Sequence, residues 1–283
     1  MTTADTSTWQ VRDSETVIVG NEALLGQTHQ IVAMTRMRNE ALILPDTLDY
    51  LARHVDAVIA YDDASTDETV ELLRAHPKVA LIIANREWER NVDARKRAEG
   101  RHRGLLLDMA RAQLPHDWMF CFDPDERVTG DLRGTVGRVD EDCDALRVRL
   151  FDAYLTTEDQ AAYTSDQALI DFRRFYGPEQ RDILMFWRNH EGIRFAGGDG
   201  RTPRGMTSVE TDLYCQHYGK SLSVEHWEET CDYYVQHFPY ETYGAKWEAR
   251  KGKAIHTESD FGNALHKWGE ALFANAVAMP VAK

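Results

Sequence analysis

Two short clusters of carboxylates hold the residue types that could bind a cation. Asp62 and Asp63 follow an apolar run, and Asp123 and Asp125 follow another apolar run farther along the chain. Carboxylates placed together repel one another unless a cation neutralises them. Hard oxygen ligands suit Mg²⁺ or Mn²⁺, which take one or two carboxylates together with substrate phosphates. If the two clusters lie together, they predict a site for a divalent cation and a phosphate-bearing ligand.

The elements that would position these clusters alternate regularly. Apolar runs and helical spacings predict strands at 31–35, 55–61, 79–84 and 118–122, with helices at 41–54, 66–75 and 100–113 between them. This alternation is typical of an α/β fold with a mostly parallel sheet flanked by helices. Ligands of such sheets bind at the carboxyl ends of the strands, where both acidic clusters fall. Each acidic cluster alone could equally be a turn or an N-cap. The prediction of a cation site therefore depends on both clusters lying at the same edge of the sheet.

Several classes of protein are excluded by what the sequence lacks. No GxGxxG and no GxxxxGK[ST] follows the first strand, which excludes the usual dinucleotide and P-loop sites. A haloacid-dehalogenase phosphatase would carry its DxD early in the chain, whereas Asp123 and Asp125 are central. The net charge of −14, from 33 Lys and Arg against 47 Asp and Glu, disfavours a nucleic-acid partner.

The sequence also indicates a compartment. No apolar run approaches the roughly 20 residues of a membrane span, and the first residues lack the pattern of a secretory signal. The four cysteines form no CxxC pair. We therefore expect a cytoplasmic protein without an integral membrane segment, either free or peripheral to the membrane.

The segment 31–127 resembles a family 2 glycosyltransferase of the GT-A fold. The motifs that carry the resemblance are RNE at 38–40, YDDASTDET at 61–69, the helix with Arg103, and DWMFCFDPDE at 117–126. The resemblance implies a Rossmann-like sheet that holds a nucleotide-sugar donor, either a UDP- or a GDP-sugar. Its implied donor-nucleotide contacts are Thr35, Arg38, Asn39, Glu40, Asp62, Asp63, Arg86, Arg103 and Asp123.

The resemblance also implies a cation site. Asp123 and Asp125 resemble the DxD motif that holds Mn²⁺ or Mg²⁺, and His217 resembles the histidine of an HYG motif that could complete the metal shell. A buried or capping histidine is the alternative for His217. A metal on the diphosphate would stabilise the charge that develops on the leaving oxygen.

A general base is harder to find. Inverting transferases use a carboxylate to take the proton of the acceptor hydroxyl. Asp199, between glycines, and Glu191, in NHEG, are the candidates. A Gly-Asp-Gly turn is the alternative interpretation of Asp199.

The chain is expected to divide into three parts. Residues 1–28 form an N-terminal extension or edge strand, and 221–283 form a C-terminal helical region that closes over the acceptor side. Between them, 29–220 form the GT-A domain, with a nucleotide-sugar-binding half (29–127) and an acceptor half (128–220). The amphipathic tail 265–281 suits packing on the body, a homodimer contact or a weak membrane contact.

These observations predict a metal-dependent glycosyltransferase, inverting in outcome, with a glycan, lipid-linked or small-molecule carbohydrate acceptor. Two alternatives remain open. A sugar nucleotidyltransferase would also use acidic metal ligands, but it usually has a glycine-rich loop after the first strand, and RMRNEA has no glycine. A non-catalytic module that binds nucleotide or carbohydrate would need no general base.

Overall fold

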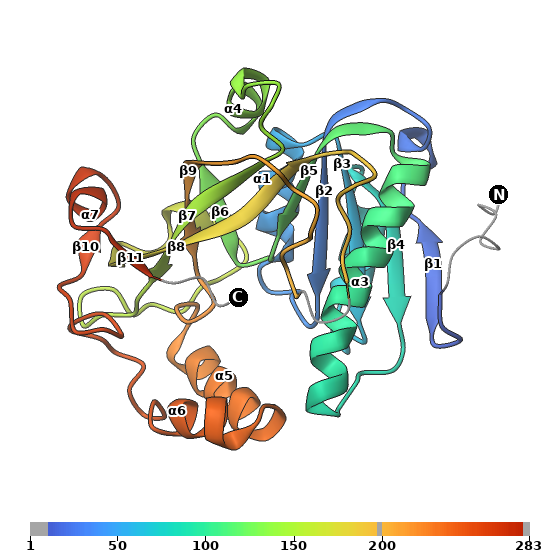
Figure 1. The fold of residues 1–283 in the computed structure, drawn as a ribbon. Helices are drawn as coiled ribbons and strands as arrows, with labels where there is room; N and C mark the ends of the chain where they lie inside the picture. The colour runs from blue at the N-terminus through green and yellow to red at the C-terminus, as the bar shows by residue number, and fades with distance from the viewer. Residues whose placement is uncertain (1–10, 197–199, 280–283) are drawn as a thin grey trace.

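A computed structural model describes residues 11–196 and 200–279 of the chain (Figure 1). In these ranges one eleven-stranded sheet has the order β1-β4-β3-β2-β5-β8-β7-β9-β6, and β10 and β11 pair with β8. The strands are β1 Glu15–Val19, β2 His29–Met37, β3 Ala57–Asp63, β4 Val79–Asn85, β5 His116–Phe122, β6 Glu126–Thr129, β7 Ala145–Ala153, β8 Phe175–Arg188, β9 Val209–His217, β10 His266–Lys267 and β11 Val277–Met279. The α-helices are α1 Leu44–His54, α2 Thr69–Ala75, α3 Val92–Gln113, α4 Leu132–Arg138, α5 Val224–His237, α6 Ala245–Glu248 and α7 Glu270–Ala274.

Strands β4, β3, β2 and β5 form the parallel part of the sheet. Their register aligns Met37 with Asp62 and Thr35 with Phe122, so the carboxyl ends of the strands meet at one edge. β3 is buried along its whole length, which explains its continuous apolar run. The predicted α/β fold with flanking helices is confirmed. The sheet as a whole is mixed, because β1, β5 and β7 pair antiparallel with their neighbours β4, β8 and β8.

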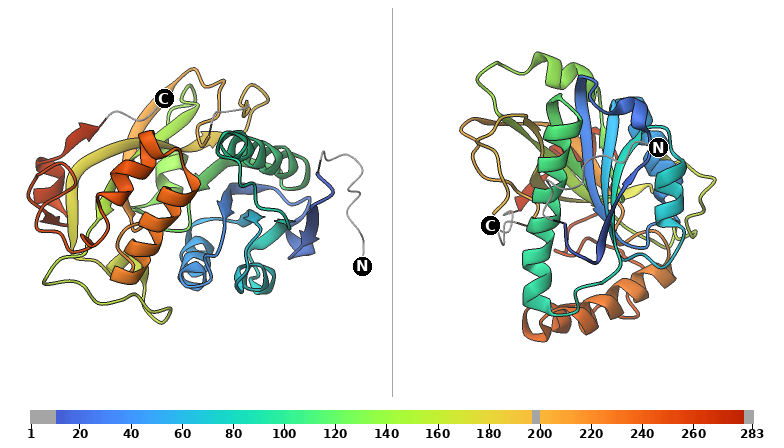
Figure 2. Two further views of the ribbon diagram at one scale, coloured as in Figure 1. Left: turned by 90° about the horizontal axis from the view of Figure 1, so that it is seen from below. Right: turned by 90° about the vertical axis from the view of Figure 1, so that its right-hand side faces the viewer.

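Helices cover both faces of the parallel part (Figure 2). On one face, α1 buries Leu44, Leu48 and Leu51 against strand residues such as Phe120. These leucines recur at helical spacing, and burying each one contributes about 2 kcal/mol. On the other face, α3 buries residues around Leu106 against the same sheet. The two helix layers hold the strand ends in fixed positions.

The second half of the chain extends the sheet and then returns to its edge. β8 pairs with β5 at its end and with β10 and β11 near its start. Helix α5 begins after Ser223, whose Oγ accepts a hydrogen bond from the backbone N–H of His226 at 3.0 Å. Trp227 and Cys231 bury the inner side of α5 against Trp247. Figure 1 shows α5 and α6 below the edge where the parallel strands end.

The predicted elements of the first half are present, with shifted ends. Helix α3 begins at Val92, earlier than the expected 100, because the charged first turns carry no apolar period. The segment 15–19 is an edge strand, β1, paired with β4. The tail packs on the body: α7 buries Leu272 next to Phe151, and β11 pairs with β8. None of the helices among the described residues combines the length and apolar character of a membrane span.

Candidate active site

Two cavities meet beside the edge of the parallel strands. The edge cavity, of about 610 Å³, is lined by residues 36–40, by Arg103, by Asp123 to Asp125 and by the facing side of α5. The side cavity, of about 470 Å³, lies between the strands β7, β8 and β9 and the segment that carries α6. Asp125 and His217 line both cavities, together with Thr230 and Tyr234 of α5. This pair therefore stands at the junction of the two spaces.

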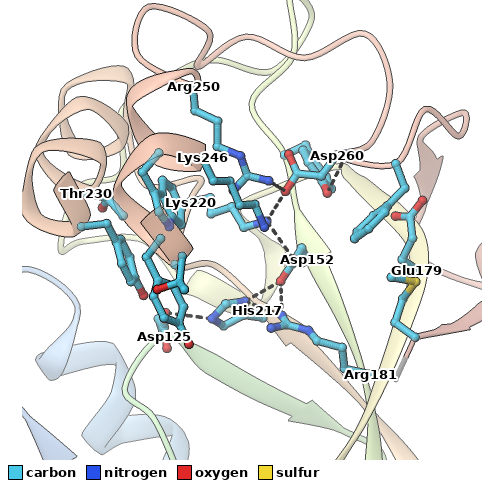
Figure 3. Close-up of a pocket in the computed structure, with 18 residues that line it drawn as sticks. Asp125, Asp152, Glu179, Arg181, His217, Lys220, Thr230, Lys246, Arg250 and Asp260 are labelled. Carbon is cyan, nitrogen blue, oxygen red and sulfur yellow. Dashed lines mark hydrogen bonds and ion pairs between the residues drawn. The ribbon is translucent and has the colours of Figure 1, made fainter. Parts of the chain in front are cut away.

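His217 is held between two carboxylates at this junction (Figure 3). Its Nδ1 lies 2.5 Å from Oδ1 of Asp152, and its Nε2 lies 3.2 Å from Oδ2 of Asp125. Burial alone would lower the pKa of His217, but the carboxylates of Asp125 and Asp152 raise it to about 10. Despite burial, His217 lowers the pKa of the Asp125 carboxyl. The imidazolium thus shares one positive charge between the two acids, and Arg181 and Lys220 supply further positive charge to Asp152.

Asp123, the other acid of the DxD, faces arginines instead. Its Oδ1 lies 3.1 Å from Nη2 of Arg103, and its Oδ2 lies 3.2 Å from Nη1 of Arg201. Arg201 also forms a bidentate pair with Glu126 at 2.6 and 2.7 Å. Glu126 Oε2 accepts a hydrogen bond from the backbone N–H of Asp123 at 2.8 Å, so Glu126 orients the turn.

The donor set fits an open cation site rather than a closed protein cage. Among the described residues, no three His, Cys, Asp or Glu side chains converge as metal ligands. Asp125 would supply one oxygen, and His217 would supply Nε2 after a cation displaces its proton, with Asp152 on Nδ1 fixing that tautomer. Gly219 lies so close that a Cβ there would meet Asp125 Oδ2 at 2.5 Å. Two such ligands suit Mn²⁺ or Mg²⁺ if phosphate oxygens complete the shell.

The acids after β3 differ in their partners. Oδ2 of Asp63 accepts from Nη2 of Arg36 at 2.5 Å, which makes Asp63 half of a buried ion pair. Asp62 uses Oδ2 to accept from the backbone N–H of Ser65, but its Oδ1 is buried without a hydrogen-bond partner, as is Oγ1 of Thr35. Burial raises the pKa of Asp62. An unpaired buried oxygen is costly, but Asp62 and Asp63 are both buried and line neither cavity.

The loop after β2 forms one wall of the edge cavity. Arg38 stacks over the ring of Trp88 at 4.2 Å, and its Nε is buried without a partner. Asn39 has a φ of 56°, and its Oδ1 accepts from the backbone N–H of Thr66 at 2.7 Å. Burial, with the nearby Asp125 and Asp123, raises the pKa of Glu40 well above its usual range. This wall therefore places the stacked guanidinium of Arg38 near a group of carboxyls, those of Glu40, Asp123 and Asp125.

Five predicted residues within the described ranges line neither cavity. Thr35, Asp62 and Asp63 are buried near the strand ends, and Arg86 and Glu191 lie elsewhere. Arg86 donates to the backbone oxygen of Asp13 at 2.8 Å and lies beside β1. Glu191 follows Asn189 and His190. The backbone N–H of Asn189 donates to Asp117 at the start of β5, and the backbone oxygen of His190 accepts from Arg111 at the end of α3. Asp123 follows the other end of β5, so Glu191 lies at the opposite edge of the sheet. Asp199 lies outside the described residues.

Other residues of the site were missed by the sequence patterns. Arg201 was not singled out, although it bonds to both acids of the Asp123 turn. Asp152 ends the alternating strand β7, where period-two spacing predicts a strand but not its ion pairs. Lys220 follows the HYG motif directly, and that adjacency was the available signal. The remaining residues of the side cavity are brought together by contacts between α5, α6 and β8, and no local sequence pattern predicts such contacts.

A family model described as glycosyl transferase family 2 matches residues 34–201, more than half of the chain. The chain belongs to glycosyl transferase family 2. The match begins inside β2 and covers β3, β4, β5, the turn with Asp123 and Asp125, and part of the second half. Uncharacterized proteins of Mycobacterium tuberculosis and Mycobacterium bovis are each 36% identical to this family 2 chain over 177 residues. That alignment covers 60% of the chain and 39% of each relative, so the chain spans about two fifths of their length.

Solved structures were also compared with this family 2 chain. Glucosyl-3-phosphoglycerate synthase from Mycobacterium tuberculosis, in complex with Mn²⁺, UDP and glucosyl-3-phosphoglycerate, is 13% identical with a TM-score of 0.37, over 75% of this chain and 81% of that one. A putative glucose-1-phosphate thymidylyltransferase from Bacillus anthracis, in complex with a sucrose, is 10% identical with a TM-score of 0.32, over 83% and 87%.

Proposed function

We propose that this chain is a metal-dependent glycosyltransferase that moves a sugar from a UDP- or GDP-sugar to a carbohydrate acceptor. The observation that carries the proposal is the junction of two cavities at Asp125 and His217. A group transfer needs two substrates whose reacting atoms meet at one point. Family membership supports sugar transfer as the reaction, and the two cavities provide separate places for donor and acceptor.

The edge cavity is the proposed donor side. Asp62 and Asp63 are buried behind its wall, and Asp63 would act by holding Arg36, which lines the cavity. Arg38 and Arg103 would face the diphosphate, because both line the edge cavity and an arginine fork matches phosphate oxygens. Arg103 would then exchange its contact with Asp123 for one with phosphate. The stacked Trp88 holds the guanidinium of Arg38 in place.

Asp125 and His217 would hold the divalent cation, and Asp123 would join them once its arginines turn to phosphate. A bound Mn²⁺ or Mg²⁺ would supply Lewis-acid stabilisation of the charge on the diphosphate. Asp152 would orient the imidazole, and Gly219 keeps the space in front of Asp125 and His217 free of a side chain.

The proposed outcome is inversion, which needs a general base next to the acceptor hydroxyl. Asp152 is bound by Arg181 and Lys220, and Asp260 by Lys220 and Arg250. Burial raises the pKa of both carboxyls, but these cations outweigh it and leave the pKa lowered. Such groups are poor bases. Asp199 remains our prediction for the base, and its place in the sequence is two residues before Arg201.

Release of nucleoside diphosphate from a panel of UDP- and GDP-sugars, with Mn²⁺ or with EDTA, tests the proposal. We expect at least one donor to be hydrolysed or transferred only with metal, and Asp125→Ala to reduce the rate at least about 100-fold. Asp140→Ala, at an exposed turn, is the matched control and should change nothing. A binding module would release no diphosphate, a nucleotidyltransferase would instead consume pyrophosphate, and either result would refute the proposal.

A further inference from the structure

The side cavity is rich in cations although the whole chain has a net charge of −14. Apart from the shared pair of Asp125 and His217, three carboxylates line it, and four cationic side chains face them. The carboxylates are those of Asp152, Glu179 and Asp260, and the cations are Arg181, Lys220, Lys246 and Arg250. An acidic protein has no general reason to gather four cations in one cavity, so the way they pair is informative.

Three of the cations are used by two acids. Lys220 bridges Asp152 at 2.9 Å and Asp260 at 2.7 Å, as Figure 3 shows. Arg181 lies 2.5 Å from Asp152, and Arg250 lies 2.6 Å from Asp260. These contacts hold the three cations in fixed positions around the cavity. Once Lys246 and the carboxylate of Glu179 are included, the cations exceed the acids by one positive charge, apart from the pair of Asp125 and His217.

The fourth cation, Lys246, has no ion pair or side-chain hydrogen bond within the described residues. Its side chain is exposed at the cavity, one turn before Arg250 in the chain. Partial burial, followed by repulsion from the neighbouring Arg250 and Lys220, lowers the pKa of Lys246, and attraction to Asp260 and Asp152 offsets this only in part. A bound anion would replace this repulsion with attraction.

The remainder of the lining suits a hydroxylated molecule. Oε1 of Glu179 accepts from Ser259 and Asn263, both at 2.6 Å, which fixes this buried carboxylate at the wall. Its other oxygen remains available to accept from a hydroxyl. Trp247 packs flat against Tyr234 at 4.5 Å, and both rings line the cavity. Aromatic surface with a few fixed polar groups is typical of small-ligand sites, and about 470 Å³ suits a ligand of one or two sugar rings.

We propose that the side cavity binds an acceptor that carries a carboxylate or phosphate group on a small hydroxylated skeleton, and that Lys246 selects for this charge. The proposal rests on the proposed function, because it takes the side cavity as the acceptor side. Arg250 and Lys220 stand next to Lys246 and would share the anion with it. The opposite end of the cavity, at Asp125 and His217, would receive the hydroxyl that accepts the sugar.

Binding of matched probes to the full chain tests this directly. Isothermal titration compares glucose with glucuronate and with glucose 6-phosphate, so that the neutral, carboxylate and phosphate forms share one skeleton; inorganic phosphate is the minimal probe. We expect at least one anion to bind about ten-fold more tightly than glucose. Lys246→Glu should remove that preference. Lys253→Glu makes the same charge change on an exposed lysine outside the cavity and should retain it.

The outcomes separate this inference from the proposed function. If no anion binds more tightly than glucose, or if Lys246→Glu leaves the preference unchanged, the inference is wrong. Nucleotide binding with Mn²⁺ is measured on the same samples. Nucleotide binding without anion preference would overturn only the acceptor class, whereas anion preference without any nucleotide binding would overturn the donor site and retain an anion-binding cavity.

Discussion

Gly219→Ala is the change that most selectively damages the proposed cation site. A Cβ at this position would lie 2.5 Å from Oδ2 of Asp125 and 3.0 Å from Nε2 of His217. Ordinary contact begins near 3.4 Å, so the Asp125 oxygen must move by about 0.9 Å and the imidazole by about 0.4 Å. Both atoms are ends of side chains, so they can move without the backbone. The fold should therefore survive while the two proposed ligands separate.

The size of the effect follows from these displacements. Misplacing reacting groups by about 1 Å can cost about 100-fold in rate, and disturbing the surroundings of metal ligands typically costs about 10- to 100-fold in metal affinity. We expect Gly219→Ala to weaken Mn²⁺-dependent nucleotide binding about 10- to 100-fold. Overpacking should cost no more than about 1–3 kcal/mol of stability.

Isothermal titration of nucleotide with Mn²⁺, together with urea unfolding, measures both effects. Gly137→Ala in α4 is the control, because a Cβ there meets nothing closer than 3.9 Å. It should leave affinity unchanged and, as a helical Gly→Ala change, leave stability equal or higher. Wild-type affinity in Gly219→Ala, with a folded protein, would refute the assignment of Asp125 and His217 as the cation site.

Three further predictions concern stability and the donor side. Burial raises the pKa of Glu15, but hydrogen bonds from Arg101 and other donors outweigh it and hold the pKa below its ordinary value of 4.5. The ionised carboxylate therefore stabilises the fold above pH 4.5, and this contribution is lost as the pH falls below that value. Glu15→Gln should lower the unfolding free energy by roughly 2 kcal/mol at pH 7 and flatten its decline in acid. Asp46→Asn should cost roughly 3 kcal/mol in urea unfolding, since it removes the 2.7 Å ion-pair partner of the fully buried Arg127; a loss below about 0.5 kcal/mol would contradict this. Trp88→Ala should weaken nucleotide binding about five-fold by titration and Trp88→Phe much less, because the ring supports a cavity arginine; equal losses would count against the cation–π role.

The parallel part of the fold could be predicted because its strands are buried on both faces. Ala57–Asp63 and Val79–Asn85 read as apolar runs that end in polar residues, and this locates the strand ends as well as the strands. The first turns of α3 could not be predicted from periodicity. They place Arg95 over the ring of Trp88 and Glu99 near Arg36, so charge replaces the usual apolar stripe.

The candidate site, like the fold, could be predicted only where a local sequence motif marks it. Motifs next to the strand ends indicated Asp125, and the HYG motif indicated His217; the structure places them 3.2 Å apart. The side cavity could not be predicted, because its walls come from β7, β8, β9 and the segment after α5, which meet only in the folded chain. Glu191 shows that a local motif does not indicate which edge of the sheet a residue will occupy. Its sequence suits a base, but β8 carries it to the far edge of the sheet.

Titration of UDP and GDP into the full chain, with Mn²⁺ and with EDTA, tests the central claim most directly. The account predicts that at least one of these nucleotides binds, and that Mn²⁺ strengthens its binding at least about ten-fold through Asp125 and His217. If neither nucleotide binds with or without metal, the edge cavity is not a donor site and the account is wrong.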